Sequence, residues 1–188
     1  ALPISKPLII YGLAETLESL KENILNWKVW PDFSELDLIN KSGKSIIFTE
    51  IDFGDVFEIS GLTIEPIKTC HTIASCGYKI TKDGRTTIIT SDTGPCDEVV
   101  RVVKETKNLK NLVIECAFPS RFKKLAHDSM HLTPLLLEEE LKKIGRTDLK
   151  IFINHLKPFY EAEIRSELSA IPLLGSAEVL EDGYKIPY

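Results

Sequence analysis

The stretch Ser91-Asp92-Thr93-Gly94-Pro95 directly follows the β-branched run Thr-Thr-Ile-Ile-Thr at positions 86–90. A run of this composition favours a strand, and the glycine and proline must end it. The Asp92 carboxylate is therefore expected at the carboxyl end of a strand. In α/β proteins this is the position where the chemistry usually takes place.

Three further segments place a histidine beside a turn or a helix start. His71 and His155 each follow a short apolar run, and His131 lies just before a Thr-Pro pair that is typical of a helix start. Imidazole and carboxylate groups are the ligands of zinc, manganese and iron in hydrolytic sites. Spacing alone suggests a metal site that combines these histidines with Asp92, but each histidine taken singly is more often structural.

The composition is that of a globular protein. The chain has 188 residues, which is long enough for a sizeable core. Its formal net charge of −5 argues against a large nucleic-acid footprint. We expect a single domain over residues 1–188, with no membrane-spanning segment because no run approaches ~18 apolar residues. The four cysteines have no CxxC spacing, so we interpret them as reduced thiols of a cytoplasmic protein.

The hydrophobic pattern changes along the chain. An apolar strand at 8–12 precedes an amphipathic helix at 14–26, the segment 45–68 predicts an antiparallel meander, and a hairpin turn is expected at 82–84. After Pro95, strands alternate with helices. We expect helices at 96–105, 133–144 and 159–168, strands at 112–116 and 151–153, and a closing hairpin at 181–183.

Five motifs occur in order along the chain. They are His71 with Ser-Cys-Gly-Tyr at 75–78, Ser-Asp-Thr-Gly-Pro at 91–95, Glu-Cys-Ala-Phe-Pro-Ser at 115–120, Leu-Ala-His-Asp-Ser-Met-His-Leu-Thr-Pro at 125–134 and His-Leu-Lys-Pro at 155–158. From about Pro7 to the end, the chain thereby resembles the class II cyclic-nucleotide phosphodiesterases, which belong to the metallo-β-lactamase-fold hydrolases. The resemblance implies an α/β fold of the αββα sandwich type.

The resemblance also implies roles for individual residues. His71 corresponds to a histidine on a first metal ion, Asp92 to the aspartate that bridges two ions, and His155 to a histidine on the second ion. His131 is similar to a non-ligand histidine that assists leaving-group departure in the sister ribonuclease Z family. Lys157 is a candidate phosphate contact, with a solvated lysine as the equal alternative. The implied cofactors are two divalent ions, zinc first and manganese or iron as alternatives.

The chain departs from the family pattern in one respect. The signature His-x-His-x-Asp-His is absent, and Leu8-Ile9-Ile10-Tyr11-Gly12 resembles the strand that follows it. We therefore expect that the sequence lacks an N-terminal part, that this fragment holds metal weakly or not at all, and that activity belongs to the intact parent. His127 matches no ligand position.

The predicted function is hydrolysis of cyclic AMP or cyclic GMP, and two alternatives stay open. The first is a ribonuclease Z-like enzyme that processes transfer RNA, although only ten residues, 81–90, lie where that family inserts its RNA-gripping arm. The basic cluster at 121–124 is either a short RNA contact or a solvated helix face. The second alternative is a catalytically inactive interaction protein with the same fold. A homodimer is also left open.

Overall fold

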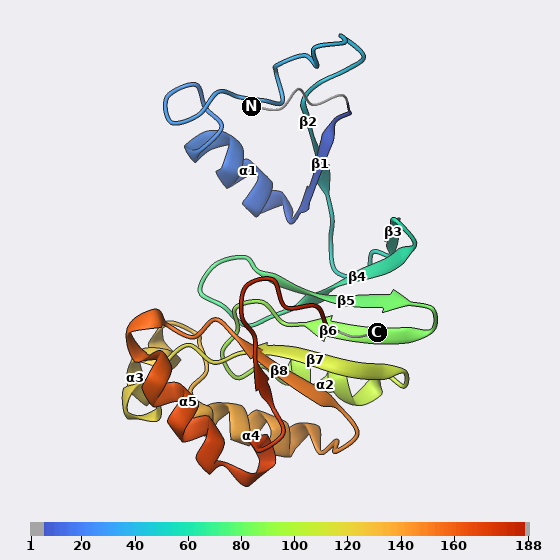
Figure 1. Cartoon of the computed structure of the whole chain (residues 1–188). Coiled ribbons are helices and arrows are strands. Elements are labelled where there is room, and N and C mark those ends of the chain that lie inside the picture. Colours follow the sequence, from blue (N-terminus) through green and yellow to red (C-terminus); the bar gives the residue numbers. More distant parts are fainter. Residues whose placement is uncertain (1–5, 187–188) are drawn as a thin grey trace. The chain divides into compact units, whose positions relative to one another are not determined.

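The computed structural model describes residues 6–186, and the chain divides into two compact units (Figure 1). The first unit ends at Asp52 and the second begins at Phe53. The expectation of a single domain over 1–188 stays a prediction.

The first unit is a strand-helix-strand element. β1 (Leu8–Gly12) pairs in parallel with β2 (Ile46–Glu50), and α1 (Ala14–Asn23) lies between them in the sequence. The predicted strand and helix are confirmed. The prediction that the segment after 45 opens an antiparallel meander is wrong for β2, because the crossover through α1 returns the chain parallel to β1.

The second unit is built on one mixed sheet of seven strands, in the order β3-β4-β5-β6-β7-β8-β9 (Figure 1). The strands from β3 to β6 are antiparallel, and those from β6 to β9 are parallel. The bounds are β3 (Phe57–Ile59), β4 (Leu62–Lys68), β5 (Cys76–Lys82), β6 (Arg85–Ile89), β7 (Leu109–Glu115), β8 (Lys150–Asn154) and β9 (Glu178–Val179).

The turns of the sheet follow local chemistry in one place and long-range pairing in another. Asp83 and Gly84 both have positive φ, 48° and 73°, as a two-residue hairpin turn requires, so the predicted turn between β5 and β6 is confirmed. The predicted closing hairpin at 181–183 is wrong within the described residues. The turn forms, but Leu180 N donates to Ile153 O and holds the chain against β8, and no strand follows up to residue 186.

Helices cover one face of this sheet. They are α2 (Asp97–Glu105), α3 (Lys123–Asp128), α4 (Pro134–Ile144) and α5 (Glu161–Ala170), with single 3₁₀ turns at Ser120–Phe122, Pro158–Tyr160 and Pro172–Leu174. The start of α4 is the one predicted: Thr133 Oγ1 accepts from Leu136 N at 3.3 Å, and Pro134 occupies the first turn. The helix ends at Gly145, whose φ is 66°.

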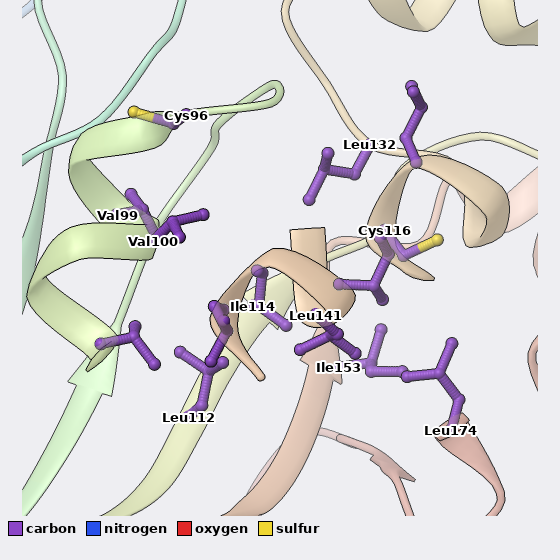
Figure 2. Close-up of a cluster of buried hydrophobic side chains, with 14 of the residues drawn as sticks. Cys96, Val99, Val100, Leu112, Ile114, Cys116, Leu132, Leu141, Ile153 and Leu174 are labelled. Carbon is purple, nitrogen blue, oxygen red and sulfur yellow. The ribbon is translucent and has the colours of Figure 1, made fainter. Parts of the chain in front are cut away.

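The core lies between the helices and the sheet. Leu112 and Ile114 of β7 and Ile153 of β8 belong to the same buried cluster as Val99 of α2 and Leu141 of α4 (Figure 2). Full burial of such side chains stabilises the fold by about 1.5–3 kcal/mol each. The rigid layer that results fixes the strand ends that carry the functional side chains. Within the described residues, no helix combines the length and apolar character needed to cross a membrane.

Two leucines of α4 test the assignment of this core. Leu137 is fully buried, whereas Leu135 is 48% exposed. We predict that Leu137→Ala lowers the free energy of unfolding by about 2–5 kcal/mol, because it leaves a cavity. Leu135→Ala serves as the control and should change it by less than about 0.5 kcal/mol. Denaturant unfolding measures both, and equal effects would contradict the packing of α4.

Candidate metal centre

The candidate site lies at one edge of the seven-stranded sheet. Because β4 and β6 are both antiparallel to β5, and β6 to β8 are parallel, the carboxyl ends of β4, β6, β7 and β8 meet at this edge. His71 follows β4, Asp92 follows β6, Glu115 ends β7 and His155 follows β8. His131 joins them from the loop that precedes α4.

The side chains of this edge approach one another closely. Ligating atoms of His71, Asp92 and His131 all lie within 4.8 Å of one another. His155 Nε2 lies 3.5 Å from Asp92 Oδ2, and its ring stacks on that of His131 at 5.2 Å between centroids. The structure therefore brings together all the histidines and the aspartate named from the sequence except His127. Their individual roles as ligands or catalytic groups stay predictions.

Hydrogen bonds decide which ring nitrogens face the site. His71 Nδ1 donates to the carbonyl of Met130 at 3.1 Å, which leaves Nε2 with its lone pair. His131 Nδ1 lies 2.6 Å from Glu115 Oε1, so Nε2 is again the free nitrogen. Burial lowers the pKa of His131 and of His155, which favours their neutral rings.

Glu115 is the group at this site whose role the sequence did not reveal. Its side chain is fully buried, and its carboxylate accepts hydrogen bonds from Thr93 N at 2.8 Å and Leu132 N at 3.1 Å in addition to its contact with His131. Burial raises the pKa of Glu115 to about 7. An acid that ends the apolar run 112–114 was the available signal, because such a residue must find partners inside the fold.

The loops around the site pack closely and are strained. A Cβ added at Gly94 would lie 3.2 Å from Met130 Cα, and Gly94 N donates to Cys70 O at 2.7 Å. Ser91, Met130 and His155 have positive φ values of 55°, 54° and 64°. Such conformations cost free energy in residues other than glycine and are concentrated at functional sites.

The donor set suits a divalent transition metal. Imidazole and carboxylate are the ligands of zinc, iron and manganese, and two atoms bonded to one such ion lie roughly 3.4 Å apart. The separation of 3.5 Å between His155 Nε2 and Asp92 Oδ2 fits this value. His131 also fits the role of a metal ligand. A histidine whose second ring nitrogen is hydrogen-bonded to a carboxylate is typical of metal ligands as well as of proton donors.

Two remaining candidates differ in position. Lys157 Nζ lies 3.1 Å from His155 Nε2 and 5.8 Å from the centroid of the Phe118 ring, so it is part of the site. If His155 held an ion through Nε2, that ion would compete with Lys157 for this nitrogen. His127 lies 3.5 Å from Asp128 with a side chain that is 78% exposed, and it lies outside the group formed by His71, Asp92 and His131.

No family model matches the sequence, but individual proteins do. The chain is 26% identical over 179 residues to a probable 3′,5′-cyclic-nucleotide phosphodiesterase of Yersinia pestis. It is 28% identical over 177 residues to a 3′,5′-cyclic-nucleotide phosphodiesterase of Aliivibrio fischeri. These matches cover 81% and 79% of this chain and 50% and 51% of the relatives, so the chain spans about half the length of the curated relatives it matches.

Solved structures show the fold. The metallo-β-lactamase fold protein YhfI of Bacillus subtilis matches with a TM-score of 0.68 and 18% identity over 95% of this chain and 64% of that one. The short form of human tRNase Z matches with a TM-score of 0.63 and 16% identity, over 98% of this chain and 70% of that one. Zn²⁺-bound PqqB of Methylobacterium extorquens matches with a TM-score of 0.61 and 12% identity, over 100% of this chain and 64% of that one. The chain therefore has the metallo-β-lactamase fold, as predicted, and its sequence resembles those of the cyclic-nucleotide phosphodiesterases.

Proposed function

We propose that the protein is a metal-dependent phosphodiester hydrolase and that its substrate is a 3′,5′-cyclic nucleotide, cyclic AMP or cyclic GMP. The observation that carries the proposal is the convergence of Asp92 with His71, His131 and His155 at one sheet edge. The names of the two sequence relatives support the substrate class.

The proposed cofactors are two divalent cations, with zinc as the first choice and manganese or iron as alternatives. His71 and Asp92 would hold one ion, and Asp92 and His155 the other, with Asp92 as the bridge. When bound, such ions activate water for attack and offset the negative charge of the phosphoryl group. Three protein ligands for two ions fall short of the four that zinc prefers, so we expect weak binding by this chain.

His131 is the proposed general acid. Its Nδ1 is held by the buried carboxylate of Glu115, and the edge of the Phe118 ring packs against it at 5.8 Å between centroids. This support fixes the orientation of Nε2, the nitrogen proposed to give a proton to the departing ribose oxygen. The donating form is the imidazolium, so the neutral ring must first take up a proton at Nε2. Glu115 also stabilises positive charge on the ring, as a carboxylate behind a catalytic histidine does in other hydrolases.

Lys157 is the proposed phosphate contact. Its ammonium group lies beside His155 and above the ring of Phe118, so it carries a positive charge into the site. A charge-assisted hydrogen bond from an ammonium to a phosphate oxygen is stronger than a neutral one. The proposed displacement of Lys157 from His155 by an ion leaves the ammonium free for this contact.

Two features disfavour the transfer-RNA alternative. The β5–β6 connection is a tight turn at Asp83 and Gly84, which offers no arm for gripping RNA. The basic cluster is also neutralised within the chain, which weakens its attraction for phosphates. Its three cations each face a carboxylate: Arg121 pairs with Glu163, Lys123 with Glu139 and Lys124 with Asp128.

We also propose that the protein acts in the cytoplasm. Its four cysteines are free thiols in the structure, which agrees with a reducing compartment. The homodimer stays a prediction.

The role of His131 can be separated from metal binding. We predict that His131→Ala in the full-length parent lowers turnover of cyclic AMP by about 10²–10⁴, the size of a general-acid contribution, while bound zinc stays unchanged. His127→Ala is the matched control, because this histidine is exposed and outside the ligand group. Steady-state kinetics and metal analysis measure both quantities. Loss of metal in His131→Ala would make His131 a ligand.

Asp92 should dominate metal affinity. We predict that Asp92→Asn lowers the zinc affinity of the chain by at least about tenfold, since even groups behind the ligands contribute that much. Asp97→Asn is the control, because its side chain is 96% exposed. Equilibrium dialysis with zinc gives both affinities, and an unchanged value for Asp92→Asn would remove Asp92 from the site.

The substrate class is tested by direct comparison. We predict that the full-length, metal-loaded protein hydrolyses cyclic AMP or cyclic GMP and leaves precursor transfer RNA intact. Efficient trimming of the RNA without turnover of cyclic nucleotides would favour the ribonuclease Z alternative. Inactivity on both substrates would favour the interaction protein.

A further inference from the structure

A hollow of about 380 Å³ has His155 in its wall, and nothing in the proposed function uses it. Its lining includes Asn154, His155 and Leu156 at the end of β8, Glu161 at the start of α5, and Tyr184 from the C-terminal segment. A volume of this size is in the range of small-ligand sites. Because His155 forms part of the wall, a ligand in the hollow touches the candidate metal centre.

Asn154 offers an unused amide to this hollow. Side chains alternate along β8, so Asn154 points to the same side as Phe152, whose ring packs against Tyr184 at 5.7 Å between centroids. The amide of Asn154 is half-buried and forms no hydrogen bond with any other side chain or backbone group among residues 6–186. It therefore has both a donor and an acceptor free for a ligand.

Tyr184 supplies an aromatic wall. Its hydroxyl donates to Glu178 Oε2 at 2.6 Å, and its ring contacts Phe152, so the ring is held at both ends. The side chain is nevertheless 44% exposed. A fixed and accessible ring next to a free amide is suited to a flat ligand with polar edges, because aromatic rings stack well on such ligands.

The carboxylates of the hollow favour an occupant other than phosphate. Glu161, Glu181 and Asp182 line it, and among the described lining residues there is neither a lysine nor an arginine. Arg165, which is not part of the lining, pairs with Glu161 at 2.7 Å and lies 3.8 Å from Glu181, so it offsets part of this negative charge. Carboxylates accept hydrogen bonds from N–H groups and repel phosphate oxygens. A group that carries N–H donors and no negative charge therefore fits the hollow better than a phosphate does.

We propose that this hollow binds the nucleobase of the substrate and that the base is adenine. The amide of Asn154 pairs with the amino group and the adjacent ring nitrogen of adenine, which is the bidentate geometry that asparagine offers to this base. Tyr184 stacks on the base, and a carboxylate accepts the second proton of the amino group. The proposal rests on the proposed function, because a base held here leaves its phosphate beside His155.

The test measures binding of cyclic AMP and of ribose 5-phosphate to the full chain, with and without zinc, by equilibrium dialysis. Asn154→Ala should weaken cyclic AMP binding by about five- to 150-fold, the worth of one bidentate base contact. Affinity for ribose 5-phosphate and for zinc should stay unchanged. Asn108→Ala is the matched control, since Asn108 is exposed and lies outside the hollow.

A second pair of variants covers the case in which Asn154→Ala does not fold. Tyr184→Leu should weaken cyclic AMP binding. Tyr184→Phe keeps the aromatic ring and should therefore retain the affinity for cyclic AMP. Unchanged affinity in Tyr184→Leu, or an equal loss for ribose 5-phosphate, overturns the proposal. Tighter binding of cyclic GMP than of cyclic AMP overturns the assignment of adenine.

The two proposals can fail separately. Suppose that binding depends on the base and requires Asn154, but the full-length protein hydrolyses no phosphodiester. This result supports base binding in the hollow and contradicts the proposed function. Suppose instead that the wild type, Asn154→Ala and Tyr184→Leu hydrolyse cyclic nucleotides with the same Michaelis constant. This result supports the proposed function and contradicts base binding in the hollow.

Discussion

The arrangement of the site depends on the buried carboxylate of Glu115. It joins the end of β7 to two loops that are distant in the sequence, since it accepts from Thr93 N in one loop and from Leu132 N in the other, where it also contacts His131 Nδ1. A buried carboxylate without partners is strongly unfavourable, so the two loops are held where they satisfy it. Loss of this carboxylate would leave the buried N–H donors unpaired, and each unpaired donor lowers the free energy of unfolding by about 1–3 kcal/mol. The orientation of His131 and the position of the Asp92 loop are thus set by one interaction.

The sheet makes this interaction possible. Its antiparallel half ends at β6 and its parallel half begins there, which gathers the carboxyl ends of four strands at one edge. The core under β7 and β8 keeps those ends in register, and the close contact of Gly94 with Met130 brings the loops together. The strained backbone at Ser91, Met130 and His155 is then held by its surroundings.

Local sequence patterns predicted most of the second unit. The helices after Pro95, the turn at Asp83 and the histidine positions follow from periodicity, turn chemistry and strand ends, which are short-range signals. The pairing of β2 with β1 did not follow, because a short apolar strand does not specify its partner. The partners of Glu115 and the free amide of Asn154 also depend on segments far away in the chain, so no local pattern indicates them.

We propose that Asp92 and its neighbouring histidines form one metal centre. The most direct measurement is anomalous X-ray diffraction at the zinc absorption edge from crystals of the chain grown with zinc. The account predicts a peak within bonding distance, about 2.0–2.2 Å, of Asp92 and of His71 or His155. Zinc bound only at other residues, or no peak at this sheet edge at saturating zinc, would contradict it.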